Sequence, residues 1–176
     1  GAWDSIRELF AAAPLSRERG YTASKFSFNS GDGRCPTCGG SGFEHVEMQF
    51  LSDVYLRCPD CDGKRYRPEI LEVTITRKKL DKLGSDSNLS SRAGQAKELD
   101  SDPNYSLSVA DVLALTVSEA VAFFANDREV LRALAPIVEV GLEYVKLGQP
   151  VPTLSGGEAQ RLKLAGFLAG AAKSAS

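Results

Sequence analysis

Four cysteines constrain the fold of this chain more than any other feature. They form two Cys-x-x-Cys pairs, Cys35/Cys38 and Cys58/Cys61, with 19 residues between the pairs. Such a pair places two sulfurs on one tight turn, and two turns supply the four thiolates of a tetrahedral zinc site. The spacing therefore predicts one structural Zn²⁺ held by all four cysteines. Because a closed four-sulfur site keeps no open position, we expect no zinc catalysis.

Two other uses of the cysteines fit the pattern less well. A disulfide framework is typical of small secreted proteins, whereas this chain has 176 residues, and we expect no signal peptide in it. A redox dithiol needs only one pair. His45, the only histidine, lies off the ligand spacing, so we expect it on the surface or packed on a hairpin.

The residues between the cysteine pairs alternate as in a β-strand. Val46, Met48 and Phe50 are separated by Glu47 and Gln49, and an apolar run follows at 54–56. Alternation with period two on either side of a short polar stretch predicts an antiparallel hairpin. This hairpin would hold the two cysteine pairs together.

A second motif lies near the C-terminal end, where residues 153–161 (the signature segment) read Thr-Leu-Ser-Gly-Gly-Glu-Ala-Gln-Arg. Ser155 and Glu158 have the spacing of a capping box and predict the start of a helix. Gly156 and Gly157 allow another molecule to approach the first turn closely. Free N–H groups and the helix dipole there favour an anion such as phosphate. The plain alternative is a capped surface helix with a flexible entrance.

The signature segment resembles the LSGGE motif of the ABC ATPases, which completes a nucleotide site built mainly by another ATPase core. The resemblance implies nucleotide-binding roles for Leu154, Ser155, Gly156, Gly157, Glu158 and Gln160. The chain has no G-x-x-x-x-G-K-[ST] loop and no apolar strand that ends in Asp-Glu. Phosphoryl transfer needs a phosphate cradle, a lysine and a magnesium ligand. We therefore predict that the chain alone is not an active ATPase and holds no catalytic residue.

Further motifs include Val-Gly-Leu-x-Tyr-x-Lys-Leu-Gly-Gln at 140–149 and Cys-Asp-Gly-Lys-Arg-Tyr at 61–66. Others lie at 26–29, 33–35, 46–48, 50–51, 53–55, 71–73, 110–113 and 153–165. Together they resemble the UvrA family, the damage-sensing ATPases of bacterial nucleotide excision repair with two ABC cores per chain. The resemblance covers about residues 3–168. It implies a segment inserted between the phosphate-binding loop and the Asp-Glu strand of the second core.

The resemblance also implies the partners and cofactors of the complete protein. The partners would be DNA, the rest of the UvrA chain with both ATPase cores, a second UvrA copy and a UvrB-type protein. ATP and Mg²⁺ would bind only in the complete protein. No apolar run approaches the roughly 18 residues of a membrane span, so we expect a cytoplasmic protein and no membrane partner.

Residues 76–107 depart from the family pattern, because this stretch is rich in Ser, Asp, Lys and Gly where the family usually has a short link. We expect a polar surface insertion, partly helical around 93–99. It indicates a divergent member, for which protection against a DNA-reactive compound is an alternative to repair. A different alternative is a chaperone-like interaction module, because residues 35–42 resemble the Cys-x-x-Cys-x-Gly-x-Gly repeat of DnaJ-type proteins. That reading leaves the signature segment without an explanation.

These observations predict an α+β, mainly helical fold in which a helical signature subdomain carries an inserted four-cysteine hairpin. The parts are an N-terminal helical part (1–29), a zinc module with its hairpin (30–75, the cysteine module), the polar insertion (76–107) and a helical part ending in the signature helix (108–176). Start signals at Ser108, Thr116 and Asn126 predict three helices, the last interrupted near Pro136. The signature helix would largely bury its large apolar side chains, Leu162, Leu164, Phe167 and Leu168.

The net charge of −2 argues against a uniformly basic nucleic-acid binder, but residues 57–82 hold eight Lys and Arg against five Asp and Glu. A local excess of +3 beside a rigid turn predicts phosphate contacts. The candidate DNA contacts are Lys64, Arg65 and Arg67, followed by Arg34 and Lys25. The alternative is that Arg65 and Tyr66 pack the cysteine module against the helical body.

Overall fold

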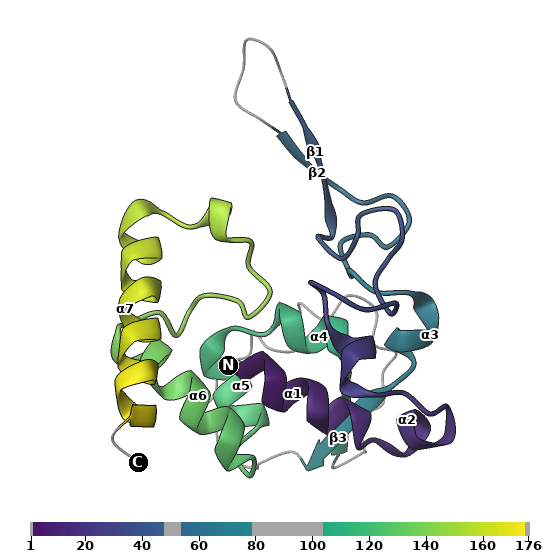
Figure 1. The fold of residues 1–176 in the computed structure, drawn as a ribbon, viewed down its shortest axis with the longest axis horizontal. Coiled ribbons are helices and arrows are strands. Elements are labelled where there is room, and N and C mark those ends of the chain that lie inside the picture. Colours follow the sequence, from purple (N-terminus) through teal and green to yellow (C-terminus); the bar gives the residue numbers. More distant parts are fainter. Residues whose placement is uncertain (1, 48–53, 79–103, 175–176) are drawn as a thin grey trace.

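Helices make up most of the regular structure in the part of the chain that the computed structural model describes, residues 2–47, 54–78 and 104–174 (Figure 1). The helices are α1 (Ala2–Ala11), α2 (Pro14–Glu18), α3 (Pro68–Leu71), α4 (Val109–Ala114), α5 (Val117–Phe123), α6 (Arg128–Glu139) and α7 (Gly156–Ser174), with 3₁₀ turns η1 (Ala23–Phe26) and η2 (Val151–Thr153). The strands are β1 (Phe43–Val46), β2 (Val54–Arg57), β3 (Thr74–Lys78) and β4 (Asn104–Ser108). They pair into two small antiparallel sheets, so the α+β, mainly helical prediction is confirmed.

The main core lies where α1 packs against α6 and η1, and where α5 packs against α6. Ile6 and Phe10 project from one face of α1 and are fully buried. They meet Phe124 and Leu134 in one continuous apolar cluster. A spacing of four residues places Ile6 and Phe10 on the same side of a helix, which is why a helix as short as α1 can bury both.

Two capping boxes start the short helices α4 and α5, as predicted. Ser108 accepts a hydrogen bond from the Asp111 N–H at 3.3 Å, and the Asp111 carboxylate accepts the Ser108 N–H at 2.9 Å. Thr116 and Glu119 repeat this exchange at the start of α5. Each box satisfies N–H groups that lack an intrahelical partner, which matters most in helices this short.

The prediction for α6 is partly wrong. The helix begins at Arg128 rather than at Asn126, with Asp127 as the N-cap. It also runs through Pro136 to Glu139 without interruption, and Pro136 is buried. Proline lacks the N–H of a regular helical turn and disfavours a helix interior. Here the position lies one turn from the end, where Gly141 (φ 72°) then turns the chain away.

Strands β3 and β4 form a sheet that the sequence analysis did not predict. Their register runs from Thr74 opposite Ser108 to Lys78 opposite Asn104. Residues 76–78 and 104–107, which the sequence analysis places in the polar insertion, therefore belong to paired strands. The Arg77 guanidinium closes the sheet onto α6 through an ion pair with Asp127 at 2.7 Å. Residues 79–103, including the helix predicted around 93–99, lie outside the described residues.

The predicted hairpin is present and projects away from the helical body (Figure 1). Strands β1 and β2 pair from Phe43 opposite Arg57 to Val46 opposite Val54. The ring centroids of His45 and Tyr55, which lie opposite each other, are 5.1 Å apart. His45 is thus exposed and packed on the hairpin, as expected. The predicted strand positions 48–53 lie outside the described residues.

Helix α7 contradicts the predicted burial of its apolar side chains. Phe167 is 78% exposed, Leu164 51% and Leu168 39%, while Leu162 is half-buried and Ala165 is buried. Small and apolar residues are spread around the whole helix rather than gathered on one face. Contact with α6 therefore covers one stripe and leaves the other apolar residues outside it. None of the described helices is long and apolar enough to span a membrane.

Tyr66 attaches the cysteine module to the helical body. Its side chain is buried in the main core, and its hydroxyl donates to the Phe26 carbonyl at 2.8 Å. The Trp3 indole N–H donates to the same carbonyl at 3.2 Å. Tyr66 of the cysteine module and Trp3 of α1 thus both bind the carbonyl of Phe26 in η1, which connects the three parts.

Substitution of Tyr66 should separate its packing role from its hydrogen bond. Tyr66→Phe should lower the free energy of unfolding by about 1 kcal/mol, because the Phe26 carbonyl keeps its bond from Trp3. Tyr66→Ala should cost about 3–5 kcal/mol, because it leaves a cavity the size of a ring. Urea denaturation measures both values. Equal stability of the alanine variant and the parent would contradict the attachment role.

Candidate functional site

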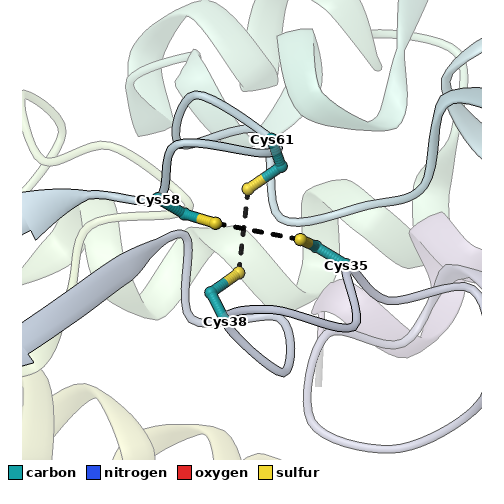
Figure 2. Close-up of side chains that lie close together, drawn as sticks. All are labelled: Cys35, Cys38, Cys58 and Cys61. Carbon is teal, nitrogen blue, oxygen red and sulfur yellow. Dashed lines mark hydrogen bonds between the residues drawn. The ribbon is translucent and has the colours of Figure 1, made fainter.

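The four cysteines converge at the base of the hairpin, as predicted (Figure 2). Cys35 and Cys38 come from the loop before β1, and Cys58 and Cys61 from the loop after β2. All four sulfurs lie within 4.8 Å of one another, with Cys35 to Cys58 at 3.9 Å and Cys38 to Cys61 at 3.7 Å. A tetrahedron with metal–sulfur bonds of about 2.3 Å has sulfurs roughly 3.8 Å apart. The donor set therefore fits one tetrahedral metal ion.

The backbone around the sulfurs is arranged to stabilise thiolates. The Gly42 N–H donates to the Cys38 sulfur at 3.3 Å, and the Arg65 N–H donates to the Cys61 sulfur at 3.4 Å. Gly42 and Arg65 both have positive φ, 80° and 72°. This conformation turns each amide back toward its cysteine, and outer-shell hydrogen bonds of this kind orient and tune metal ligands.

Burial raises the pKa of the Cys61 thiol to about 12. Burial also acts to raise the pKa of Cys38, but the N–H groups of Gly42 and Gly40 and the neighbouring Cys61 and Cys35 thiols together outweigh it and lower that pKa to about 7. Adjacent negative sulfurs repel each other, so one thiolate forms well before its neighbour. A divalent cation at the centre removes this conflict, because it deprotonates coordinating thiols outright.

A disulfide is not present in the cluster, since all four cysteines are free and the sulfur pairs are far beyond the bonded distance of about 2.05 Å. The sulfurs form a small buried cluster of their own, separate from the main core. Such a cluster has little apolar area to hold it together. A bound metal would supply the missing stability.

The signature segment forms the predicted helix start. Glu158 accepts the Ser155 N–H at 2.7 Å, and the Ser155 hydroxyl accepts the Glu158 N–H at 3.3 Å. Gly156 and Gly157 are exposed, and a Cβ added at either would meet no atom within 4 Å. Leu154 precedes the cap and is half-buried, and Gln160 is exposed. The first turn of α7 is therefore open to an incoming group.

Two residues that the sequence analysis missed hold this helix start in place. The Tyr144 hydroxyl donates to the Glu158 carboxylate at 2.7 Å, and Arg161 donates to the Tyr144 oxygen at 3.3 Å. Arg161 also donates to the Gly141 carbonyl at 3.2 Å, just after α6. The hydrogen bond from Tyr144, with those of the capping box, lowers the pKa of Glu158. The sequence signal that could have identified Tyr144 is its place in the 140–149 motif, which lies close to the signature segment.

The basic candidates for DNA contact differ in how they are placed. Lys64 and Arg67 are exposed. The Arg34 guanidinium instead donates to the carbonyls of Asn29, Gly31 and Gly39, and Lys25 forms an ion pair with Asp32. The half-buried Arg65 guanidinium donates to the Gly148 carbonyl. The exposed Arg67 also donates to the Arg34 carbonyl at 3.3 Å, so four of the five candidates have a partner within this chain.

Comparison with known proteins relates this arrangement to a family, although no family model matches the chain. The chain is 47% identical to the UvrABC system protein A of Thermus thermophilus over 165 residues, which cover 94% of this chain and 14% of that protein. The corresponding protein of Methanothermobacter thermautotrophicus is 44% identical over 165 residues, again 94% of this chain and 14% of that protein. The chain therefore spans about one seventh of the length of these relatives.

A solved structure agrees with the sequence relatives. The crystal structure of UvrA2 from Deinococcus radiodurans matches 96% of this chain and 17% of that chain, with a TM-score of 0.73 and 45% sequence identity. The match includes both the fold and the sequence, and it extends over almost all of the residues. The chain belongs to the UvrA family and corresponds to a segment of its longer members.

Proposed function

We propose that this chain is the part of an ABC-type repair ATPase that couples ATP binding and hydrolysis to DNA binding. The observation that carries the proposal is the open first turn of α7 in the signature segment, with two exposed glycines at the positive end of a capped helix. N–H groups there suit a phosphate. Membership of the UvrA family supports nucleotide excision repair as the process and the cytoplasm as its place.

The nucleotide would be held mainly by other parts of the complete protein. The chain lacks a phosphate-binding loop and a strand ending in Asp-Glu, so ATP and Mg²⁺ would enter with the two ATPase cores. Ser155 and the backbone of Gly156 and Gly157 would then contact the γ-phosphate from the opposite side. Leu154, Glu158 and Gln160 would shape this turn. The segment would sit in the second core, with a second UvrA copy and a UvrB-type protein as further partners.

Zinc is the proposed metal, and its role is to hold structure. Four thiolates select zinc or an iron–sulfur centre over hard cations such as Mg²⁺. The four sulfurs lie within 4.8 Å of one another and surround a single tetrahedral position. They therefore favour one ion, held by Cys35, Cys38, Cys58 and Cys61. The ion would fix the loop after β2, which carries Lys64 and Arg67, to the loop before β1 and so present both charges on a rigid base.

The proposed DNA contacts rest on Lys64 and Arg67, because both are exposed and lie within six residues after Cys61. In the complete protein, a variant with Lys64→Gln and Arg67→Gln should bind DNA less tightly. The slope of log affinity against log salt should fall by about 1 for each residue, because each neutralised phosphate releases counterions. Fluorescence anisotropy over a salt series measures affinity and slope together.

A matched control is Lys163→Gln, which removes an equally exposed charge from α7. This variant should keep the parent affinity and slope. Metal content and thermal unfolding show whether the double variant remains folded. A folded, metal-loaded double variant with the parent's affinity at low salt and the parent's slope would show that these residues do not contact DNA.

A further inference from the structure

The backbone of Arg65 is part of the metal centre. Its N–H donates to the Cys61 sulfur at 3.4 Å, and its carbonyl accepts the Cys35 N–H at 2.9 Å. Its φ of 72° is unusual for a residue with a side chain. The two cysteine loops therefore fix where the Arg65 side chain leaves the backbone.

The Arg65 side chain connects this centre to a distant part of the chain. Its half-buried guanidinium donates to the Gly148 carbonyl, 83 residues away, and lies 5.4 Å from the Phe28 ring centroid. Burial lowers the pKa of this guanidinium, yet arginine keeps its charge in proteins. A charged donor bonded to a carbonyl away from bulk water makes a strong link.

Gly148 is itself held firmly. Its N–H donates to the Leu113 carbonyl at 2.8 Å, and a Cβ at this position would lie 2.9 Å from that oxygen. The preceding Leu147 N–H donates to the Leu115 carbonyl at 2.9 Å. From Gly148 only six residues lead to Ser155, and three of them form η2. Arg65 is thus hydrogen-bonded to the chain shortly before the signature segment.

Beside this link, the hairpin and the segment that contains η2 are not closely packed. Phe43, His45 and Tyr55 on the hairpin face Pro150 and Pro152 across a largely apolar cavity of about 230 Å³. A hollow of this size lets the hairpin and η2 shift against each other. The polar contact at Gly148 is then the point at which a displacement of the metal centre reaches the signature segment.

We propose that Arg65 is a positioning residue that couples the metal centre to the signature segment, rather than a DNA contact. The proposal rests on the proposed nucleotide function. When DNA or the hairpin moves the cysteine loops, Arg65 moves with them, because its N–H and carbonyl are bonded to Cys61 and Cys35. Its guanidinium then pulls on, or releases, the Gly148 carbonyl, and the open turn at Gly156 shifts relative to the nucleotide.

The test compares Arg65→Gln and Arg65→Lys with Arg17→Gln, which removes an exposed arginine charge from α2, in the complete protein. Arg65→Gln should lower kcat for ATP about tenfold in the absence of DNA, within the usual range of coupling effects. KM for ATP should change little, because most of the nucleotide site lies elsewhere. Metal content and the salt slope of DNA binding should stay at the parent values. Arg65→Lys should restore part of kcat, since an ammonium group still donates to a carbonyl, and Arg17→Gln should leave kcat unchanged.

Three results would overturn the coupling role. One is parent-level kcat in Arg65→Gln while a bulky residue at Gly156 abolishes turnover, which leaves the proposed nucleotide function standing. A second is a flatter salt slope with unchanged kcat, which would make Arg65 a DNA contact. A third is loss of metal in both Arg65 variants, which would make it a packing residue of the cysteine module. If neither Arg65→Gln nor the Gly156 variant alters turnover, the proposed nucleotide function itself fails.

Discussion

Removal of the metal should unfold the cysteine loops and the hairpin while the helical body stays folded. The purified chain is expected to hold one Zn²⁺, and Cys58→Ala should abolish its binding. Structural zinc sites contribute about 10–16 kcal/mol of apparent binding free energy, which becomes folding free energy for the part they hold. Here the buried residues of that part are mainly the cysteines themselves. The main core around Phe10 and Leu134 is a separate cluster and should persist.

Elemental analysis and two-dimensional NMR of the parent and of Cys58→Ala measure metal content and local order together. The amide signals of β1 and β2 should collapse, whereas those of α1, α5 and α6 should stay dispersed. His45→Ala is the matched control, because it lies in the same hairpin outside the sulfur cluster and should keep its metal. Parent protein purified without chelator that contains no zinc, or in which the cysteines are joined by disulfides, would refute the assignment.

Replacement of Gly156 by Val should abolish ATP turnover in the complete protein without harming the fold. An added Cβ at Gly156 would meet no atom within 4 Å, and no positive φ forces glycine at this position. The substitution is therefore tolerated within this chain. A loss of activity must then come from a group that approaches from outside, which is the γ-phosphate in the proposed function. We expect kcat to fall by about 100-fold or more, the usual loss when one oxyanion contact is removed.

Gly166→Ala provides the matched control, because Gly166 lies in the same helix and is equally open. It should leave turnover unchanged and slightly stabilise the helix, since alanine has the higher helix propensity. Steady-state ATPase assays and circular dichroism on both variants separate folding from activity. The 176-residue chain alone should not hydrolyse ATP. Rapid, magnesium-dependent hydrolysis by this chain, or full activity of Gly156→Val, would contradict the assignment of the signature segment.

The features that the sequence predicted correctly are those specified by a few neighbouring residues. Capping boxes at Ser108, Thr116 and Ser155 need only a side chain and an amide three residues apart, so they form whatever surrounds them. The metal cluster is also local, because each Cys-x-x-Cys turn places its own two sulfurs. One pairing register of the hairpin then brings the two turns together.

The errors concern contacts between distant residues. Pro136 ends a helix by local rules, but burial one turn from the C-terminus keeps it inside α6. The exposure of Phe167 depends on which side of α7 meets α6, and an evenly apolar helix does not indicate this. The sequence analysis left the direction of Arg65 open between DNA and the helical body, because it depends on Gly148, 83 residues away, which no local pattern identifies. The same applies to the pairing of β3 with β4, because residues 79–103 separate the two strands in the sequence.

The pairing of β3 with β4 makes the length of the chain between them nearly irrelevant to the rest of the molecule. Lys78 and Asn104 lie directly opposite each other in the ladder, so the two ends of the intervening stretch are held about 5 Å apart. The ladder thus fixes both ends of this stretch whatever its length. Doubling the length of a loop with fixed ends costs only about 0.6 kcal/mol. Evolution can therefore lengthen, shorten or replace this stretch, and a fluorescent reporter could be inserted there, at little thermodynamic cost to the metal centre or the signature helix.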